Sequence, residues 1–222
     1  MVQSNGAYKG STHIDTIYKG SSRINKIYKG STLIYQRGVL TEFSQIFTTS
    51  GDITFPDSAF DIEVRVVGGG GGSAYMYISG KQYYMGGAGG SGGMSVSSYG
   101  NTLKGQTCNF TVGGGGAAAT NYMVDGSAGG SSSFTSSNGT MYGNGGGGGG
   151  RGTGSFYYQG PGGAGGTASG GNLQNTSGNA GGAGTTYGAN GGVSLWNGYG
   201  AGGKTVAAGT TGCVYIYYKY YV

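Results

Sequence analysis

Residues 62–72 read Ile-Glu-Val-Arg-Val-Val-Gly-Gly-Gly-Gly-Gly. Ile62, Val64 and Val66 alternate with charged residues, which is the two-residue period of a β-strand with one buried face. The strand then runs directly into backbone that carries no side chains. This stretch therefore predicts a fold in which ordinary strands frame glycine tracts.

Other segments show the same alternation around residues 53–55, 107–112 and 213–218. Their apolar faces consist of Ile53, Phe55, Cys108, Phe110, Val112, Val214, Ile216 and Tyr218. We expect these side chains to form the core. Cys108 and Cys213 belong to different strands, and either two buried thiols or a disulfide between neighbouring strands fits the pattern.

Glycine accounts for 57 of the 222 residues, against an ordinary usage of roughly 7%. Collagen is excluded because the chain has only two prolines and glycine does not recur at every third position. Helix is excluded because no window has a 3.6-residue apolar period and glycine costs about 1 kcal/mol per helical position. The tracts lie at residues 68–72, 86–93, 113–116, 143–154, 160–171, 178–192 and 198–203.

The remaining regular conformation for glycine is the extended helix with three residues per turn, which has no internal hydrogen bonds. Copies of it must bond to one another through their N–H and C=O groups. We therefore predict a mainly β protein with essentially no α-helix, in which strands frame a bundle of polyglycine helices. Replacing Gly147 or Gly165 by Val should prevent folding, because no Cβ fits between packed backbones.

The first 36 residues form a repeat with a ten-residue period. Tyr-Lys-Gly-Ser occurs at residues 8–11, 18–21 and 28–31, and this pattern is typical of short strands joined by turns, as in a small β-meander or β-solenoid. Three such units bury too little apolar surface to be stable alone. We expect them to dock on another protein through Tyr8, Ile14, Ile17, Tyr18, Ile24, Ile27, Tyr28 and Ile34.

Charge and hydropathy narrow the class of protein. The net charge is +5, but the basic residues are scattered, so no nucleic-acid partner is expected. No stretch approaches the roughly 20 apolar residues of a membrane helix. The first residues have neither the basic region nor the apolar run of a signal peptide. These features predict a soluble protein made in a reducing cytosol.

Nothing in the sequence favours an enzyme, and we expect no catalytic residue, metal or cofactor. Residues 198–205 match the phosphate-binding loop pattern with Lys204 and Thr205, but the final strand follows too soon for the helix that such a loop needs. The single histidine, His13, occupies a repeat position that holds Arg23 and Leu33 elsewhere.

Aromatic side chains are the informative ones, since the chain has 20 tyrosines and one tryptophan. Their rings should lie at tract ends or loop tips. There they either cap the bundle and pack at subunit interfaces or form a recognition surface. We expect loops 73–85, 155–159 and 193–199 to gather at one end. The candidate receptor-binding residues are Tyr75, Tyr77, Tyr83, Tyr84, Tyr157, Tyr158, Trp196 and Tyr199.

Three segments together resemble the glycine-rich domain found in many phage tail proteins. They are residues 47–72, with a Ser-Gly turn, a strand ending in Pro56 and a strand running into glycines, then residues 105–113 and residues 212–218. The Tyr-Lys-Gly-Ser repeats resemble a module at the N-termini of gut-phage and prophage proteins. The tract spacing is similar to that of the tip adhesins of T-even-like phages, in which loops between polyglycine helices contact the receptor.

These resemblances imply a structural virion protein made in the host bacterial cytoplasm, a tail or head fibre or adhesin subunit that binds a host surface glycan or protein. The alternative is a capsid or tail decoration protein that binds only other virion subunits. The expected organisation is a docking repeat over residues 1–36, a linker over 37–43 and the glycine-rich domain over 44–222. A homo-oligomer is expected, with a trimer favoured.

Overall fold

The computed structural model describes residues 38–80, 82–153 and 157–222, together with short strands between residues 7 and 36. Every helix or strand in this described part is a β-strand, which confirms the mainly β fold predicted from the sequence. The chain divides into two compact units, Met1–Thr41 with Tyr221–Val222, and Glu42–Tyr220. We describe each unit by itself.

The first unit contains three separate antiparallel hairpins, one for each repeat. Their register is the same at the repeated lysine, which pairs with the residue three positions later: Lys9 with Thr12, Lys19 with Ser22 and Lys29 with Thr32. The strands are β1 (Ala7–Lys9), β2 (Thr12–Ile14), β3 (Ile17–Lys19), β4 (Ser22–Ile24), β5 (Lys26–Lys29) and β6 (Thr32–Gln36).

The backbone pairing of two expected docking residues is described: Ile17 pairs with Ile24 in the β3–β4 hairpin. Ile34 falls where the pairing of β5 with β6 shifts register. The side chains of Tyr8, Ile14, Ile27, Tyr28 and the other docking candidates lie outside the described part of the structure, so their expected contacts stay predictions.

The second unit contains two five-stranded sheets, whose strand orders are β18-β12-β9-β19-β7 and β17-β15-β14-β13-β8. The first consists of β7 (Leu40–Phe47), β9 (Phe60–Val67), β12 (Met94–Gly100), β18 (Gln174–Thr176) and β19 (Cys213–Tyr221). The second consists of β8 (Gly51–Thr54), β13 (Thr107–Thr111), β14 (Ser132–Ser136), β15 (Gly139–Gly143) and β17 (Ala168–Ser169). Residues 40–43, expected in the linker, therefore belong to a strand.

The two five-stranded sheets form a sandwich, and the main apolar core between them contains side chains from both. Its buried members include Val64 and Ile216 from the first sheet and Phe110 and Phe134 from the second. A smaller cluster on the first sheet contains Val67, Met94, Val96 and Cys213. Cys108 lies in the main core and Cys213 in the smaller cluster, and both are buried free thiols.

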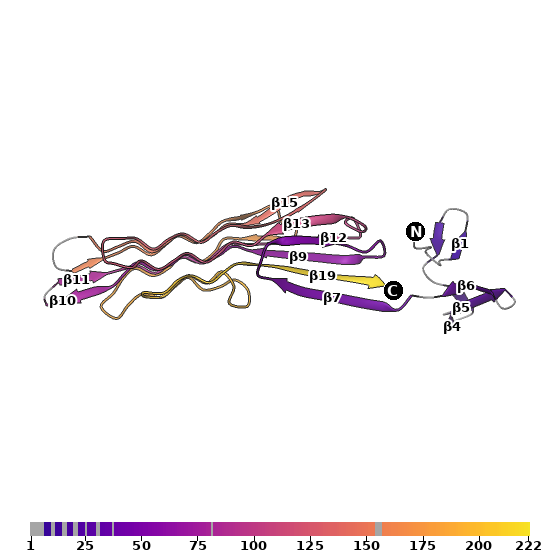
Figure 1. Ribbon diagram of the computed structural model, residues 1–222, viewed down its shortest axis with the longest axis horizontal. Helices are drawn as coiled ribbons and strands as arrows, with labels where there is room; N and C mark the ends of the chain where they lie inside the picture. The colour runs from indigo at the N-terminus through magenta and orange to yellow at the C-terminus, as the bar shows by residue number, and fades with distance from the viewer. Residues whose placement is uncertain are drawn as a thin grey trace. The chain divides into compact units, whose positions relative to one another are not determined.

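The glycine segments run from the sandwich to a small third sheet at the far end of this unit (Figure 1). Segment 68–74 lies at the centre of the bundle, and its hydrogen-bond partners repeat every third residue. The N–H groups of Gly69 and Gly72 donate to Gly130 and Ser127. The same threefold pattern joins Gly70 and Ser73 to Thr210 and Ala207, and Gly71 and Ala74 to Gly90 and Gly87.

The carbonyl groups of the same segment accept from three further segments. Gly146, Gly116 and Gly203 donate to Gly69, Gly70 and Gly71. Segment 68–74 thus bonds to six neighbours, donating to three and accepting from three, and all of its residues are buried. A second central segment, 87–93, is bonded and buried in the same way. The threefold repeat is that of the predicted extended helix.

A side chain has no room at most positions between these backbones. A Cβ on Gly71 would overlap the carbonyl of Gly147, and one on Gly165 would overlap that of Gly178. Gly147 is less tightly enclosed: a Cβ there would meet the Ala164 nitrogen at 3.0 Å, which is still closer than an ordinary van der Waals contact. Gly114 faces open space, with nothing within 4 Å of its Cβ. Substitution should therefore be costly only at inward positions.

Candidate functional site

The end of the bundle far from the sandwich carries the third sheet (Figure 1). It has three strands and is rich in tyrosine. It consists of β10 (Tyr77–Ser79), β11 (Gln82–Met85) and β16 (Tyr157–Gln159). We call it the distal sheet. Tyr84 of its middle strand pairs with Tyr77 on one side and with Tyr158 on the other. Because paired residues point to the same face, these three tyrosines form a row across the sheet.

Tyr122 joins this row from a separate turn between glycine segments. Its ring centroid lies 5.3 Å from that of Tyr77 and 4.8 Å from that of Tyr84. Both distances are in the range of favourable aromatic pairs, worth about 0.5–1.5 kcal/mol each. The turn is tied to the bundle because Arg151 donates its backbone N–H to Asp125 and its guanidinium to the carbonyl of Met123.

Apolar and aromatic side chains around this cluster are exposed to solvent. Ile78 is 49% exposed, Tyr158 42% and Met123 62%. Tyr187 is fully exposed, in a turn that follows Gly184, whose N–H donates to Gly160 directly after β16. A group of exposed apolar side chains at the end of a bundle is typical of a binding surface.

The structure brings together six of the eight candidate receptor-binding residues. Tyr77, Tyr83, Tyr84, Tyr157 and Tyr158 lie in the distal sheet, and Tyr75 lies two residues before it. The side chain of Tyr157 is outside the described part. Sequence reasoning missed Ile78 and Met123, because one apolar residue in a three-residue strand or in a turn shows no period.

Trp196 and Tyr199 do not lie with the others, so the expectation that loop 193–199 gathers at the distal end was wrong. The Trp196 ring lies 5.2 Å from that of Tyr215 in β19, a strand of the sandwich. The physical reason is that successive glycine segments reverse direction. The turn at residues 185–188 lies toward the distal sheet, and the next connection, 193–199, therefore returns to the sandwich.

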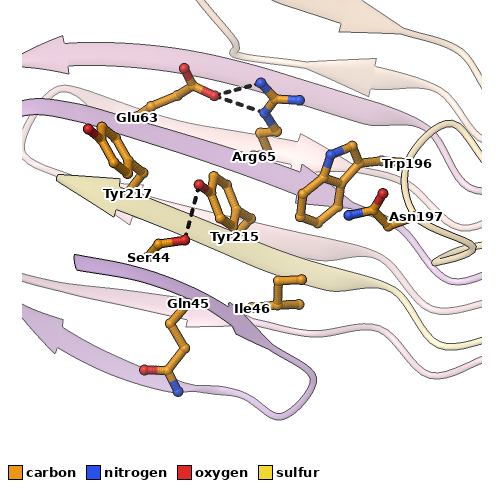
Figure 2. A pocket seen from close by; sticks show the side chains of 9 residues that line it. All are labelled: Ser44, Gln45, Ile46, Glu63, Arg65, Trp196, Asn197, Tyr215 and Tyr217. Atoms are coloured by element: carbon orange, nitrogen blue, oxygen red, sulfur yellow. Dashed lines mark hydrogen bonds and ion pairs between the residues drawn. The ribbon is translucent and has the colours of Figure 1, made fainter. Parts of the chain in front are cut away.

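Trp196 borders an open groove of about 760 Å³ on the outer face of the first sheet (Figure 2). The Arg65 guanidinium lies 5.9 Å from the Trp196 ring centroid and forms an ion pair with Glu63 at 2.8 Å. Ser44 Oγ donates to the Tyr215 hydroxyl at 3.3 Å. The groove is lined by Ser44, Gln45, Ile46, Glu63, Arg65, Trp196, Asn197, Tyr215 and Tyr217.

The loop that carries Trp196 is held in a fixed shape. Ser194 Oγ donates to the Tyr199 carbonyl at 2.6 Å and accepts from the Trp196 N–H at 3.1 Å. Asn197 adopts a positive φ of 48°, an uncommon conformation for a residue other than glycine. Such a conformation persists where the surroundings determine it.

In the segment that matches the phosphate-binding loop pattern, three glycine N–H groups that could face a phosphate already donate to other backbone carbonyls. Gly200 donates to Thr211, Gly202 to Gly192 and Gly203 to Gly71. These groups are bonded within the bundle, and no helix follows them.

Burial affects the chemistry of the two thiols. It raises the pKa of Cys108 above its usual value and that of Cys213 to about 12. Both thiols are therefore protonated at neutral pH, and a thiol in this state is a poor nucleophile and metal ligand. Within residues 38–80, 82–153 and 157–222, no three His, Cys, Asp or Glu side chains gather as a metal site.

Comparisons with known proteins identify the larger unit. The described residues include no helix that is long and apolar enough to cross a membrane. A search among curated proteins finds no match. A family model described as a glycine-rich domain matches residues 48–219, which is more than half of the chain. The chain belongs to this family of glycine-rich domains.

Proposed function

We propose that this chain is a non-enzymatic virion protein of a bacteriophage, a tail or head fibre or adhesin subunit that binds the host cell surface through its distal sheet. The observation that carries the proposal is the aromatic cluster at the end of the bundle, in which Tyr77, Tyr122 and Tyr158 are exposed and Tyr84 is half-buried. Tyrosine supplies a large amphipathic contact with few rotatable bonds to order on binding.

The bundle supports this role because it holds the cluster on a rigid base. Both central segments bond to neighbours on all sides, and their residues are buried. A surface that is already ordered loses less entropy when it binds, so more of the contact energy appears as affinity. A stiff segment with a recognition surface at its tip suits a receptor-binding fibre.

The phage assignment rests on resemblance. Residues 47–72, 105–113 and 212–218 resemble the strands of phage tail glycine-rich domains, and the Tyr-Lys-Gly-Ser repeats resemble the N-terminal module of gut-phage proteins. In this proposal the repeats attach the chain to other virion proteins, and the mature location is the virion. The subunits form a homo-oligomer, with a trimer favoured.

Binding of the purified full-length protein to a panel of bacterial strains tests the proposal. We expect saturable binding to a subset of strains. The combined variant Tyr77→Ser, Tyr84→Ser, Tyr122→Ser should bind at least about tenfold more weakly, because three aromatic contacts are lost. Tyr142→Ser is the matched control, since Tyr142 is 43% exposed on β15 of the sandwich.

The outcomes separate the proposal from its alternative. Binding to phage particles but to no strain would favour a decoration protein that contacts only other virion subunits. Equal loss in the Tyr142→Ser control would show that the effect is not specific to the distal sheet. Unchanged binding by the triple variant would contradict a receptor site at this end.

A further inference from the structure

The groove beside Trp196 combines aromatic rings with hydrogen-bonding groups, which is the chemistry of sugar recognition. The rings of Trp196 and Tyr215 lie 5.2 Å apart, with the exposed Asn197 amide beside the indole (Figure 2). We propose that this groove binds a neutral hexose unit of a polysaccharide. The site is separate from the distal sheet and does not depend on the function proposed for it.

The aromatic side chains match the apolar part of a sugar. One face of a pyranose ring carries mainly C–H groups, which pack on the π-face of an indole or phenol ring. Trp196 is partly exposed, and it also covers the smaller apolar cluster that contains Val67 and Cys213. Its ring is therefore anchored on one side by the sandwich and borders the groove on the other.

The polar side chains match hydroxyl groups, each of which can donate and accept. Glu63 Oε1 accepts from Arg65 Nε at 2.8 Å, and the two side chains are 32% and 34% exposed. The ion pair uses Glu63 Oε1 with Arg65 Nε and Nη2, so Glu63 Oε2 and Arg65 Nη1 take no part in it and point away from it on opposite sides (Figure 2). An acceptor and a donor are thus offered to hydroxyl groups of a sugar.

The charge of the groove favours a ligand without net charge. Glu63 and Arg65 neutralise each other, and the remaining lining residues are uncharged. An acidic sugar would compete with Glu63 for the guanidinium and leave that carboxylate without its partner, which is costly for a partly buried pair. We therefore expect neutral sugars to bind more tightly than acidic ones.

The geometry of the loop that carries Trp196 also supports a binding site in the groove. The two hydrogen bonds of Ser194 and the positive φ of Asn197 fix the backbone that carries Trp196. A strained residue beside an open groove is a position where a binding role is often found. A fixed loop also lowers the entropy lost when a ligand orders these side chains.

Fluorescence provides a direct test, because Trp196 is the single tryptophan of the chain. The full-length protein is titrated with neutral oligosaccharides of glucose, galactose, mannose and N-acetylhexosamines, and with sialylated and uronic acid counterparts, up to about 10 mM, well above a Kd of about 1 mM. We expect a saturable change in Trp196 emission with at least one neutral sugar and weaker binding of the acidic counterparts. Ligands that bind only at the distal sheet should leave this emission unchanged.

Variants locate the effect in the groove. Arg65→Gln and Asn197→Gly should each weaken binding about tenfold, as expected for loss of a hydrogen bond in a small site. Asn197→Gly retains a residue that tolerates the positive φ, so the loop should stay folded. Tyr84→Ser in the distal sheet is the control and should bind like the unmodified protein.

Several outcomes would overturn the proposal. These are no saturable emission change with any neutral sugar, tighter binding of acidic sugars, or unchanged affinity in both groove variants. Loss of sugar binding in Arg65→Gln with normal binding to cells would leave the distal sheet as the receptor site. The two proposals can therefore fail independently.

Discussion

The sandwich and the glycine bundle both have closely packed interiors, but different parts of the chain fill them. In the sandwich, side chains such as Val64 and Phe134 fill the space between two sheets and are fully buried. In the bundle, the backbone fills the space, and buried residues such as Gly71 contribute only N–H, C=O and Cα. The hydrophobic effect contributes most to the stability of the sandwich, whereas complete backbone hydrogen bonding contributes most to that of the bundle.

This difference predicts opposite responses to substitution. The sandwich should lose stability when side chains are made smaller, because a cavity remains. The bundle should lose stability when side chains are made larger, because neighbouring backbones cannot separate without breaking several hydrogen bonds. The following changes test this contrast.

The largest effect is expected for Gly71→Ala. The new Cβ would overlap the carbonyl of Gly147, and the neighbouring segments would have to move apart. We expect a loss of roughly 5 kcal/mol or more, in the range of the most damaging single substitutions, and little soluble protein. Soluble yield and urea unfolding measure it. Gly114→Ala is the matched control, since its Cβ meets nothing within 4 Å, and equal damage there would contradict the account.

Phe134→Ala should be the next most damaging change. Phe134 is fully buried in the main core, and removal of a buried phenyl ring costs about 3–5 kcal/mol. Urea unfolding of the variant measures this loss. Leu173→Ala is the control, because Leu173 is 62% exposed and a surface substitution should change stability by less than about 0.5 kcal/mol. A loss below that level for Phe134→Ala would show that the sandwich is not held by its side chains.

A smaller effect is expected for Tyr122→Ser in the distal cluster. Tyr122 contacts the rings of Tyr77 and Tyr84 but is 37% exposed. Its loss removes two ring pairs and should lower the stability by about 1–3 kcal/mol, measured as the shift in urea midpoint. A destabilisation as large as that of Phe134→Ala would mean that these tyrosines are structural rather than available for binding.

Cys213 should make the stability depend on pH only at high pH. Its pKa is raised to about 12 by burial, so between pH 9 and 12 the thiol ionises in the unfolded chain but not in the folded one. Its contribution is fully present below pH 9 and is lost as the pH rises toward 12. Urea unfolding at several pH values, with Cys213→Ala as the comparison, measures this slope. Identical slopes for both proteins above pH 9 would contradict the assignment.

Much of the sandwich could be predicted because its strands have a side-chain period. The alternation of Ile62, Val64 and Val66 identified β9, and that of Val214, Ile216 and Tyr218 identified β19; all six residues are buried. The extended bundle could also be predicted, since glycine tracts exclude helix and leave backbone packing as the source of order. In both cases the physical argument depended on features that the sequence displays locally.

The sequence could not show which glycines of each segment face inward, or at which end of the bundle each loop lies. Glycine runs contain no period that shows which third residue faces inward, so Gly147 and Gly165 could not be distinguished. For the same reason, Trp196 was expected at the distal end, although its loop lies against the sandwich. One feature of the sequence did indicate the groove. Tyr215 and Tyr217 occupy the outward positions of β19, where aromatic residues are not needed for the core.

Amide hydrogen exchange tests the central claim that backbone hydrogen bonds hold the bundle. The N–H groups of residues 69–74 all donate to neighbouring segments. The account predicts that they exchange as slowly as those of Val64 and Val66 in β9, through global unfolding only. Exchange of these glycines at the rate of an unstructured chain, while β9 stays protected, would contradict it.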